Sequence, residues 1–318
     1  MSESVFGPVP SRRLGKSIGI NNIPPKICSY ACIYCQLGRA IKMDIERKTY
    51  YNPQEVIAAV QERVHWVEQK GEKLDYLTFV PDGEATLDEN LGQIIQGLKP
   101  LGYRLAIITN SSLIARQDVQ DVLLQLDLVS LKIDAVSESI WRKIDHPHRE
   151  IDHEKMLRGM EVFSGKYHGK LITETMLIDG VNDETGELHL LSEFIGVLNP
   201  YAAYIAIPTR SPARKDVRPA SETKINEAYQ AFAQKIKNVE YLIGHEGNAF
   251  AHTGNTRGDI LSITAVHPMR EDSVKAFLDQ DGKDWSLITQ LIEEGLLLET
   301  SYNGYRFYVR KLSERQQV

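Results

Sequence analysis

Short apolar segments alternate with amphipathic segments along most of the 318-residue chain, and this alternation limits the fold more than any other feature. The amphipathic segments carry apolar residues at helical spacing, whereas the apolar ones have the length of buried strands. Strands are expected at 17–22, 74–80, 104–109, 128–133, 170–178 and 202–207, and helices at 53–69, 91–98, 113–126, 152–164, 185–198 and 222–237. Repeated units of this kind predict an α/β fold with a parallel sheet, here a partial (β/α)6 barrel.

The pattern changes near residue 254. Helices are expected at 258–266, 270–278 and 285–294, and two alternating segments then flank Asn303-Gly304, a strong hairpin signal. We therefore predict a barrel at 1–240, a connection at 241–253 and a small winged-helix-like domain at 254–318. This last domain carries eight Lys and Arg against ten acidic residues, which argues against DNA reading. Contact with a protein, or a lid over an active site, is the better interpretation.

All three cysteines of the chain, Cys28, Cys32 and Cys35, fall within eight residues. Thiols gathered in one short loop indicate a shared metal. No second paired motif completes a structural zinc site, whereas three thiolates can hold three irons of a cubane cluster and leave the fourth iron open. Two alternatives stay open at this point: three free buried cysteines, and a zinc ion completed by His65 or His245.

The loop, with Tyr34 before its last cysteine, resembles the cluster motif of the radical S-adenosylmethionine (radical SAM) enzymes. The resemblance implies a partial barrel whose cluster loop follows the first strand. It also implies one 4Fe-4S cluster, S-adenosylmethionine bound at the open iron, and an external one-electron donor of the flavodoxin or ferredoxin type. Reductive cleavage of S-adenosylmethionine would then give a 5′-deoxyadenosyl radical that abstracts hydrogen from a substrate.

Residues at the strand ends are the candidates for cofactor binding, because chemistry in such barrels lies at the C-terminal ends of the strands. Asp82-Gly83-Glu84 resembles the superfamily's glycine-plus-glutamate motif, with a turn and a helix-capping acid as the alternative. Asn110 and Ser112 suit ribose hydroxyls, with a helix N-cap as the alternative for Ser112. The predicted cofactor residues are Tyr34, Gly83, Glu84, Asn110, Ser112, Lys132, Asp134, Ile207 and Pro208.

Two charged residues interrupt apolar strands where a neutral residue is expected. Alternation places Lys132 and Asp134 on one face of the fourth strand, and Glu174 lies within the fifth. Buried charges are unfavourable without partners, so these residues either pair with one another or serve a ligand. We predict Lys132 and Glu174 as catalytic residues; a mutually satisfied Lys132–Asp134 pair is the alternative.

Basic residues concentrate in three segments, at 12–16, 141–149 and 210–218. Strand ends would bring these segments to one rim, which predicts a positive mouth on a chain of net charge −6. Such a mouth favours an anionic substrate: a nucleotide, RNA or a small anionic metabolite. The predicted substrate-binding residues are Arg13, Arg142, His148, Arg149 and Arg210.

Residues 6–215 resemble the radical SAM group related to the tRNA wybutosine biosynthesis enzymes, through GPVPSRR, IPPKICSYACIYCQLG, DGEATL and PHRE. Those enzymes use additional cysteines for a second cluster, and this chain has none, so their tRNA-modifying activity is not carried over. We predict a single-cluster radical SAM enzyme. The alternatives are an activase of a partner protein that docks on the C-terminal domain, and a redox-sensing nucleic-acid-binding regulator.

The sequence contains no apolar run near the ~20 residues needed to cross a bilayer. Its N-terminus lacks the basic-then-apolar pattern of a signal peptide. Because thiols that bind a cluster must stay reduced, we expect a cytoplasmic protein without membrane contact.

Overall fold

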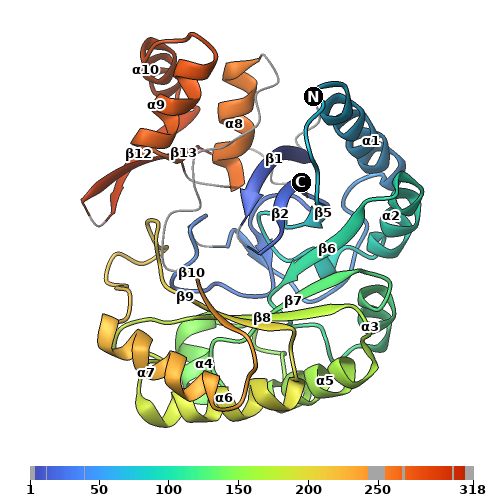
Figure 1. Ribbon diagram of the computed structural model, residues 1–318, viewed down its shortest axis with the longest axis vertical. Helices are drawn as coiled ribbons and strands as arrows, with labels where there is room; N and C mark the ends of the chain where they lie inside the picture. Colours follow the sequence, from blue (N-terminus) through green and yellow to red (C-terminus); the bar gives the residue numbers. More distant parts are fainter. Residues whose placement is uncertain are drawn as a thin grey trace.

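The computed structural model describes residues 4–11, 13–38, 40–242, 255–266, 269–302 and 304–311. Its main element is an eight-stranded sheet in the order β1-β2-β5-β6-β7-β8-β9-β10. The strands are β1 (Val5–Ser11), β2 (Gly15–Ile20), β5 (Tyr76–Phe79), β6 (Arg104–Thr109), β7 (Leu128–Lys132), β8 (Lys170–Met176), β9 (Ala202–Ala206) and β10 (Val239–Leu242). Strands β2 to β10 run parallel, and β1 pairs antiparallel with β2. The sheet curls into an open half-barrel (Figure 1).

Helices cover the outer face of this half-barrel (Figure 1). They are α1 (Pro53–Gln69), α2 (Leu91–Leu98), α3 (Gln117–Leu123), α4 (Glu138–Asp145), α5 (His153–Lys166), α6 (Thr185–Leu198) and α7 (Glu222–Ala233), with 3-10 turns η1 (Ala85–Leu87) and η2 (Lys99–Leu101). Local sequence explains where several begin. The Asn52 side chain accepts a hydrogen bond from the Gln54 amide, and Pro53 occupies the first turn of α1. Ser221 caps α7 in the same way.

Strand alternation divides the side chains between two environments. Residues such as Leu77, Phe79 and Val129 face the helices and form the main core. The opposite face points into the barrel, where Leu14, Tyr76, Ala106, Leu128, Ile172, Ala202 and Tyr204 form a smaller apolar cluster. Tyr76, Leu128 and Ala202 are the first residues of β5, β7 and β9. This cluster therefore fills the barrel at the N-terminal ends of the strands. The C-terminal ends remain for chemistry.

The α/β partial barrel and its six expected strand–helix units are confirmed. The third helix is shorter than the expected 113–126, because residues 111–116 form turns before α3 begins at Gln117. The longest elements that the sequence analysis missed are β1, β10 and α4; it also missed the two-residue strands β3 (Ile27–Cys28), β4 (Lys42–Met43) and β11 (Met269–Arg270). β1 contains Pro8 and Pro10, which suit an edge strand, and α4 lies where a basic loop was expected.

The cysteine loop has a small sheet of its own. Strand β3 (Ile27–Cys28) pairs in parallel with β4 (Lys42–Met43), and the Asp44 amide donates to the Cys28 carbonyl at 3.1 Å. This pairing joins the two ends of the loop that carries the cysteines. The first cysteine is therefore fixed by backbone hydrogen bonds rather than by its side chain alone.

The C-terminal residues form a separate module with its own apolar core. Its elements are α8 (Thr256–Val266), β11 (Met269–Arg270), α9 (Glu271–Gln280), α10 (Ser286–Glu293), β12 (Leu297–Tyr302) and β13 (Tyr305–Arg310). The strands pair antiparallel in the order β11-β13-β12. Three helices and the β12–β13 hairpin were expected; the winged-helix assignment stays a prediction. So do the domain boundaries, since residues 243–253 of the expected connection, together with residues 254 and 303, lie outside the described residues.

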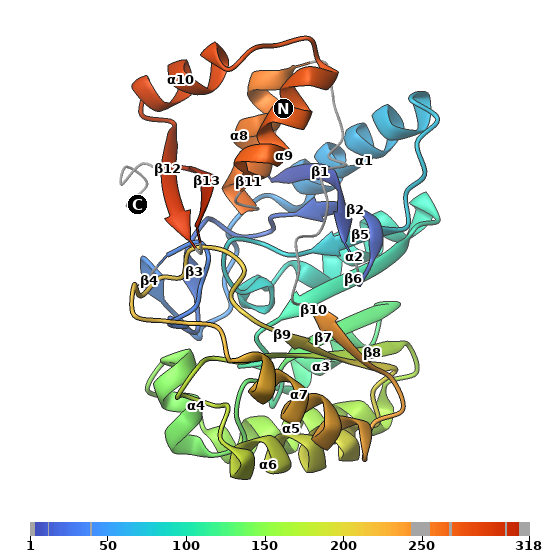
Figure 2. The ribbon, with the colours of Figure 1, turned by 60° about the vertical axis from the view of Figure 1, so that its left-hand side comes forward.

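The module packs against the barrel in several places, chiefly where α8 lies against β1. Val9 of β1 packs against the module's core. The Ser211 hydroxyl, in the loop after β9, lies 2.9 Å from the Thr300 hydroxyl of β12. Figure 2 shows the hairpin of β12 and β13 directed toward β3 and β4, beside the loop that follows β9. Across the described ranges, no helix is long and apolar enough to cross a membrane.

Candidate active site

A cavity of about 620 Å³ lies where the C-terminal strand ends meet the C-terminal module. Its volume is within the usual range for small-molecule sites, roughly 300–1,000 Å³. The structure brings most of the predicted site residues to its wall: Arg13, Cys28, Cys32, Tyr34, Cys35, Gly83, Glu84, Asn110, Lys132, Glu174, Ile207, Pro208 and Arg210. Ser112, Asp134, Arg142, His148 and Arg149 are not part of the described lining.

The three cysteines share this wall although none forms a disulfide. The Cys35 amide donates to the Cys32 carbonyl at 3.1 Å, which makes a tight turn between the last two thiols. Burial, together with the nearby Glu84 carboxylate, raises the pKa of the Cys28 thiol to about 12. Burial also raises the pKa values of Cys32 and Cys35. Since a metal-bound thiol must lose its proton, metal binding at this loop should release protons.

The zinc alternative gains no support from the described residues. His65 is exposed on α1, where its Nε2 lies 2.8 Å from Gln69 Nε2, and it is not part of the cavity lining. His245 lies outside the described residues. In the parts of the chain described, no group of three or more His, Cys, Asp or Glu side chains could hold a single metal ion. A cubane cluster does not need that convergence, because each thiolate binds a different iron.

Glu84 is held by four hydrogen bonds. Its carboxylate accepts from the Thr86 amide at 3.0 Å, the Thr86 hydroxyl at 2.6 Å, the Thr109 hydroxyl at 2.7 Å and the Asn110 amide at 2.7 Å. Glu84 also caps η1, as the helix-capping alternative proposed. Its carboxylate therefore joins the ends of β5 and β6, and its role toward a cofactor stays a prediction.

We expect Glu84→Ala to lower the free energy of unfolding by about 2–3 kcal/mol, because four buried donors lose their acceptor. Chemical denaturation of the full chain measures the effect. Glu89→Ala, in the exposed loop after η1, is the control and should change stability by less than about 0.5 kcal/mol. Equal stability of the two variants would show that Glu84 does not hold the strand ends together.

Gly83 is required by close packing of two loops. A Cβ atom at this position would lie 1.9 Å from the carbonyl oxygen of Ile27, and the same oxygen accepts a hydrogen bond from the Glu84 amide at 3.1 Å. Only a residue without a side chain lets the loop after β5 approach the cysteine loop this closely. The glycine therefore sets the position of the thiols relative to the strand ends.

Asp82, just before this glycine, was not selected by sequence reasoning. Its carboxylate is buried, and neither oxygen has a hydrogen-bond partner among the described residues. Burial raises its pKa to about 8, while the Arg310 and Lys26 cations lower it. A buried carboxylate without a hydrogen-bond donor is unfavourable unless a ligand supplies one. A buried polar atom without a partner is visible only in three dimensions, so no sequence signal could have found it.

Asn110 and Ser112 contact the cysteine loop. The Asn110 amide group donates to the Ser29 hydroxyl at 2.9 Å and approaches Cys28 Sγ at 3.5 Å. The Ser112 hydroxyl lies 2.6 Å from the same Ser29 hydroxyl and is buried. The expected N-cap role of Ser112 is wrong, because α3 begins at Gln117. Both side chains therefore fix the cysteine loop through Ser29. Of the two, only Asn110 lines the cavity.

Lys132 and Glu174 face each other across β7 and β8. The Lys132 ammonium lies 3.1 Å from the Glu174 carboxylate and 3.4 Å from Asp134, and Arg13 pairs with Glu174. The Lys132 ammonium also lies 4.9 Å from the centre of the Tyr34 ring. The alternative of a Lys132–Asp134 ion pair is therefore present in the structure. The pair belongs to a larger network that includes Glu174 and Arg13. These charges balance one another at the cavity wall.

Asp134 lies behind this wall. Its carboxylate accepts hydrogen bonds from the Tyr34 hydroxyl and from the Met176 amide, the latter at 2.7 Å. The Tyr34 hydroxyl also lies 3.3 Å from Asp145. Burial and the neighbouring Asp134 hold the pKa of Asp145 well above its usual range. The Asp134 carboxylate therefore positions Tyr34 and Lys132. It is not part of the described cavity lining.

Lys132→Met should lower the free energy of unfolding by about 2–3 kcal/mol, because Asp134 and Glu174 lose a partly buried cation. Urea denaturation of the full chain measures this loss. Lys170→Met is the matched control: Lys170 is exposed at the other end of β8, and its loss should change stability by less than about 0.5 kcal/mol. If both variants unfold at the same urea concentration, the charge network does not contribute to stability.

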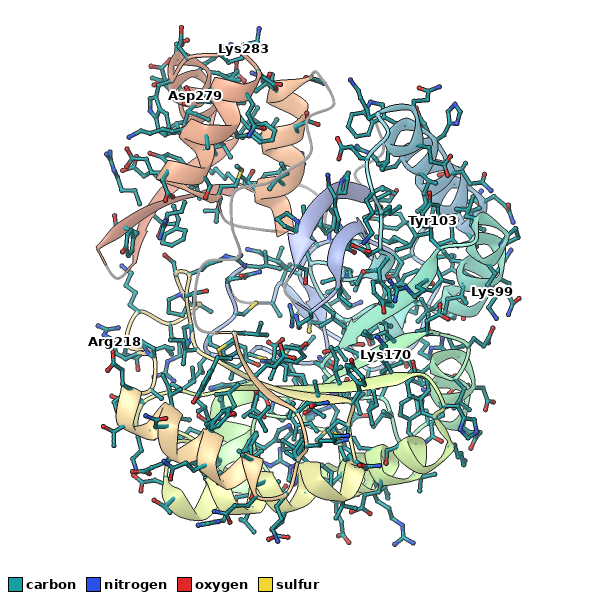
Figure 3. The ribbon with its side chains drawn as sticks, viewed as in Figure 1. Lys99, Tyr103, Lys170, Arg218, Asp279 and Lys283 are labelled. Atoms are coloured by element: carbon teal, nitrogen blue, oxygen red, sulfur yellow. The ribbon has the colours of Figure 1, made fainter. Side chains whose placement is uncertain are left out.

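The predicted basic rim is only partly present. Arg13 and Arg210 line the cavity, and Arg210 donates to the Gln36 side chain at 2.6 Å. Arg142 instead pairs with Glu138 on the exposed face of α4. Arg218 lies at the outer edge of the molecule (Figure 3), where it donates to the carbonyls of Lys215 and Val217. Arg12 lies outside the described residues.

The segment with His148 and Arg149 supports the cysteine loop from outside. The His148 amide donates to the Ser29 carbonyl at 2.8 Å, and Tyr30 forms a β-bridge with Pro147. The Arg149 side chain is 88% exposed. His146 ends α4 in a left-handed conformation, which turns the chain back across the loop. The structure therefore places this segment outside the cavity, where the sequence analysis had expected substrate contacts.

Besides residues of the cysteine loop and of the barrel, the cavity is lined by residues of the C-terminal module, which sequence reasoning missed. Arg270, Tyr305 and Phe307 come from β11 and β13 of the C-terminal module. No local pattern marks them, because their position depends on how the module packs on the barrel. The cavity is therefore shared between the two parts of the chain.

Residues 22–191 match the Radical SAM superfamily. The chain is 44% identical to the UPF0026 protein MJ1312 of Methanocaldococcus jannaschii, over 98% of this chain and 97% of that protein. The structure of TYW1 with a lysine-pyruvate adduct bound matches at TM-score 0.53 and 15% identity, over 70% of this chain and 76% of that one. A radical SAM methyltransferase from Sphaerobacter thermophilus matches at TM-score 0.54 and 15% identity, over 72% and 66%. At these identities the structures show the fold alone.

The superfamily match covers more than half of the chain and includes all three cysteines. Enzymes of this superfamily use a 4Fe-4S cluster and S-adenosylmethionine, so the two predicted cofactors are confirmed at the level of the family. The half-barrel agrees with the solved structures. The chain therefore belongs to the radical SAM superfamily of enzymes.

Proposed function

We propose that the protein holds a single 4Fe-4S cluster through Cys28, Cys32 and Cys35 and abstracts hydrogen from an anionic substrate. The observation that supports this proposal most directly is the shared cavity, lined by the three thiols together with Arg13, Lys132, Arg210 and Arg270. When bound, the cluster and S-adenosylmethionine supply reductive cleavage of the sulfonium and, from it, radical hydrogen abstraction.

The donor set of the cavity fits these cofactors. Three thiols without a fourth ligand leave one iron open, as a catalytic metal site requires. The Asp82 carboxylate, which has no hydrogen-bond partner among the described residues, is next to the lining residues Pro81 and Gly83 but is not itself part of the lining, so we assign it no contact with the cofactor. Gly83 and Asn110 would border its methionine part, and Ile207, Pro208 and Tyr34 would border its adenine.

Lys132 and Glu174 would act on the substrate side of the same cavity. Lys132 has three N–H donors, two of which are directed to Glu174 and Asp134, so one remains for a substrate oxygen. Arg13 is positioned to share its guanidinium between Glu174 and a bound anion. In this arrangement Glu174 orients the two cations, and Lys132 contacts the substrate.

The proposed chemistry needs an external one-electron donor of the flavodoxin or ferredoxin type. It also needs thiols that remain reduced until the cluster is loaded, which favours the cytoplasm. The exposed segment around Arg149 packs directly on the cysteine loop, so we propose it as a surface for such a donor.

Anaerobic reconstitution with iron and sulfide tests the proposal. We expect broad iron–sulfur absorption with about four irons per chain, and 5′-deoxyadenosine when the loaded protein is reduced in the presence of S-adenosylmethionine. Protein that takes up iron but yields no 5′-deoxyadenosine would contradict the proposed chemistry. Protein that takes up one zinc ion and no iron would contradict the cluster itself.

A further inference from the structure

The C-terminal module contributes one wall of the cavity, and this wall differs in character from the rest. Arg270 lies on β11, while Tyr305 and Phe307 lie on β13. Phe307 is 3% exposed, whereas Tyr305 is 54% exposed although it lines the cavity. A half-exposed aromatic ring beside a buried one is a surface on which a flat ligand can pack.

Arg270 is held in a fixed orientation at this wall. Its Nε donates to one Asp272 carboxylate oxygen at 2.6 Å, and its second nitrogen donates to the other oxygen. Its guanidinium carbon lies 4.6 Å from the centre of the Tyr305 ring. A bidentate pair and a ring contact together orient the guanidinium, so its remaining N–H donors require little ordering when a ligand binds.

The barrel supplies a second arginine to the cavity, close to the hairpin. Arg210 follows β9, and its neighbour Ser211 is tied to Thr300 of β12 at 2.9 Å. Arg210 and Tyr305 therefore face the same volume from two different parts of the chain. The cavity thus combines cations on both sides with an accessible aromatic ring.

We propose that this wall binds a nucleoside phosphate, either free or within single-stranded RNA, with the base stacked on Tyr305 and the phosphate between Arg210 and Arg270. The proposal deepens the anionic substrate class and rests on the proposed function for the reaction itself. Guanidinium groups suit phosphate oxygens, and every nucleobase can stack on a tyrosine. A simple inorganic anion would leave the aromatic part of the wall unused.

Equilibrium binding to the anaerobically reconstituted full chain tests the proposal. The probes are the four nucleoside monophosphates, ribose 5-phosphate, inorganic phosphate and a single-stranded RNA decamer. At least one monophosphate should bind at least tenfold more tightly than ribose 5-phosphate. Tyr305→Ala should weaken that binding about tenfold, Tyr305→Phe should retain it, and Arg270→Gln should weaken it by tenfold or more.

Two matched controls exist at other cation–ring pairs of the barrel. Tyr201 is 56% exposed with Lys170 at 4.8 Å from its ring, and Arg104 lies 4.4 Å from the Tyr76 ring. Neither Tyr201 nor Arg104 is part of the described cavity lining. Tyr201→Ala and Arg104→Gln should leave binding of the same monophosphate unchanged.

The outcomes separate the sources of the ligand. Binding of the RNA but not the monophosphates, lost in Tyr305→Ala, would assign the site to RNA. Binding of ribose 5-phosphate as tight as that of every monophosphate would overturn the stacking role. Failure of all probes, or equal loss in the Tyr201→Ala control, would overturn the proposal.

Formation of 5′-deoxyadenosine provides a separate readout. If the loaded protein cleaves S-adenosylmethionine but binds none of the probes, the substrate class is wrong while the proposed function stands. If it binds a monophosphate and yields no 5′-deoxyadenosine, the proposed chemistry is wrong while the nucleotide site stands.

Discussion

Cys32→Ala should abolish the iron–sulfur absorption of the reconstituted protein and lower the yield of 5′-deoxyadenosine by more than about 100-fold. Partners that merely orient metal ligands already contribute about 10–100-fold, so losing a ligand should have a larger effect. The chain has no fourth cysteine to replace it, since Cys28 and Cys35 are already assigned to the cluster. Iron content and the visible spectrum measure the loss of the cluster, and product chromatography measures the yield of 5′-deoxyadenosine.

Ile33→Val is the matched control for this variant. It removes one methylene group from the neighbouring position, where Ile33 is 4% exposed and packs with Ile144 and Ile178. The substitution should reduce stability by about 1 kcal/mol while leaving iron content and activity near their original values. A Cys32→Ala protein that still binds four irons and cleaves S-adenosylmethionine would remove this loop from the cluster site.

Gly83→Ala should lower the free energy of unfolding by about 3–5 kcal/mol and also impair cluster loading. The added Cβ would lie 1.9 Å from the Ile27 carbonyl oxygen, a backbone atom that cannot rotate away. The cysteine loop or the loop after β5 must move to relieve the overlap, at a cost above that of ordinary overpacking. Denaturant unfolding and the iron content after reconstitution measure the two effects.

Gly186→Ala is the matched control: it is also a glycine-to-alanine change, but we expect it to raise the free energy of unfolding. Gly186 lies in α6, and a Cβ there would meet no atom within 4 Å. Alanine should stabilise this helix by roughly 0.5–1 kcal/mol and leave cluster loading unchanged. Gly83→Ala protein that is as stable as the original and loads a full cluster would show that the two loops tolerate separation.

The barrel strands could be predicted because each one carries its own signal. Arg104–Thr109 and Ala202–Ala206 are short apolar runs between helical patterns, and their observed bounds lie close to the expected ones. The same local reasoning grouped Lys132 with Asp134 on one face of the fourth strand; Lys132 lines the cavity, whereas Asp134 follows the end of β7 and does not. Period-two alternation assigns a side chain to one face only within the strand itself.

The other parts of the site depend on contacts between distant segments. Glu84 was predicted as a cofactor residue, and no local pattern indicates that its carboxylate also accepts hydrogen bonds from Thr86, Thr109 and Asn110. The segment with Arg149 was expected on a rim, yet it packs outside the cysteine loop. In both cases the residue type at a strand end did not show which neighbours the side chain would meet. Such neighbours come from different strand–helix units, so the sequence order does not reveal them.

The shared cavity has a consequence for biosynthesis. The ribosome makes the cysteine loop early, whereas Arg270, Tyr305 and Phe307 emerge only after the entire barrel. Until β13 pairs with β11 and β12, the thiols would line a groove open to solvent and oxidants. In the complete fold the three cysteines remain partly exposed to the cavity. The order of translation therefore means that the wall formed by the C-terminal module is added to the cavity last, after the cysteine loop and the barrel strands.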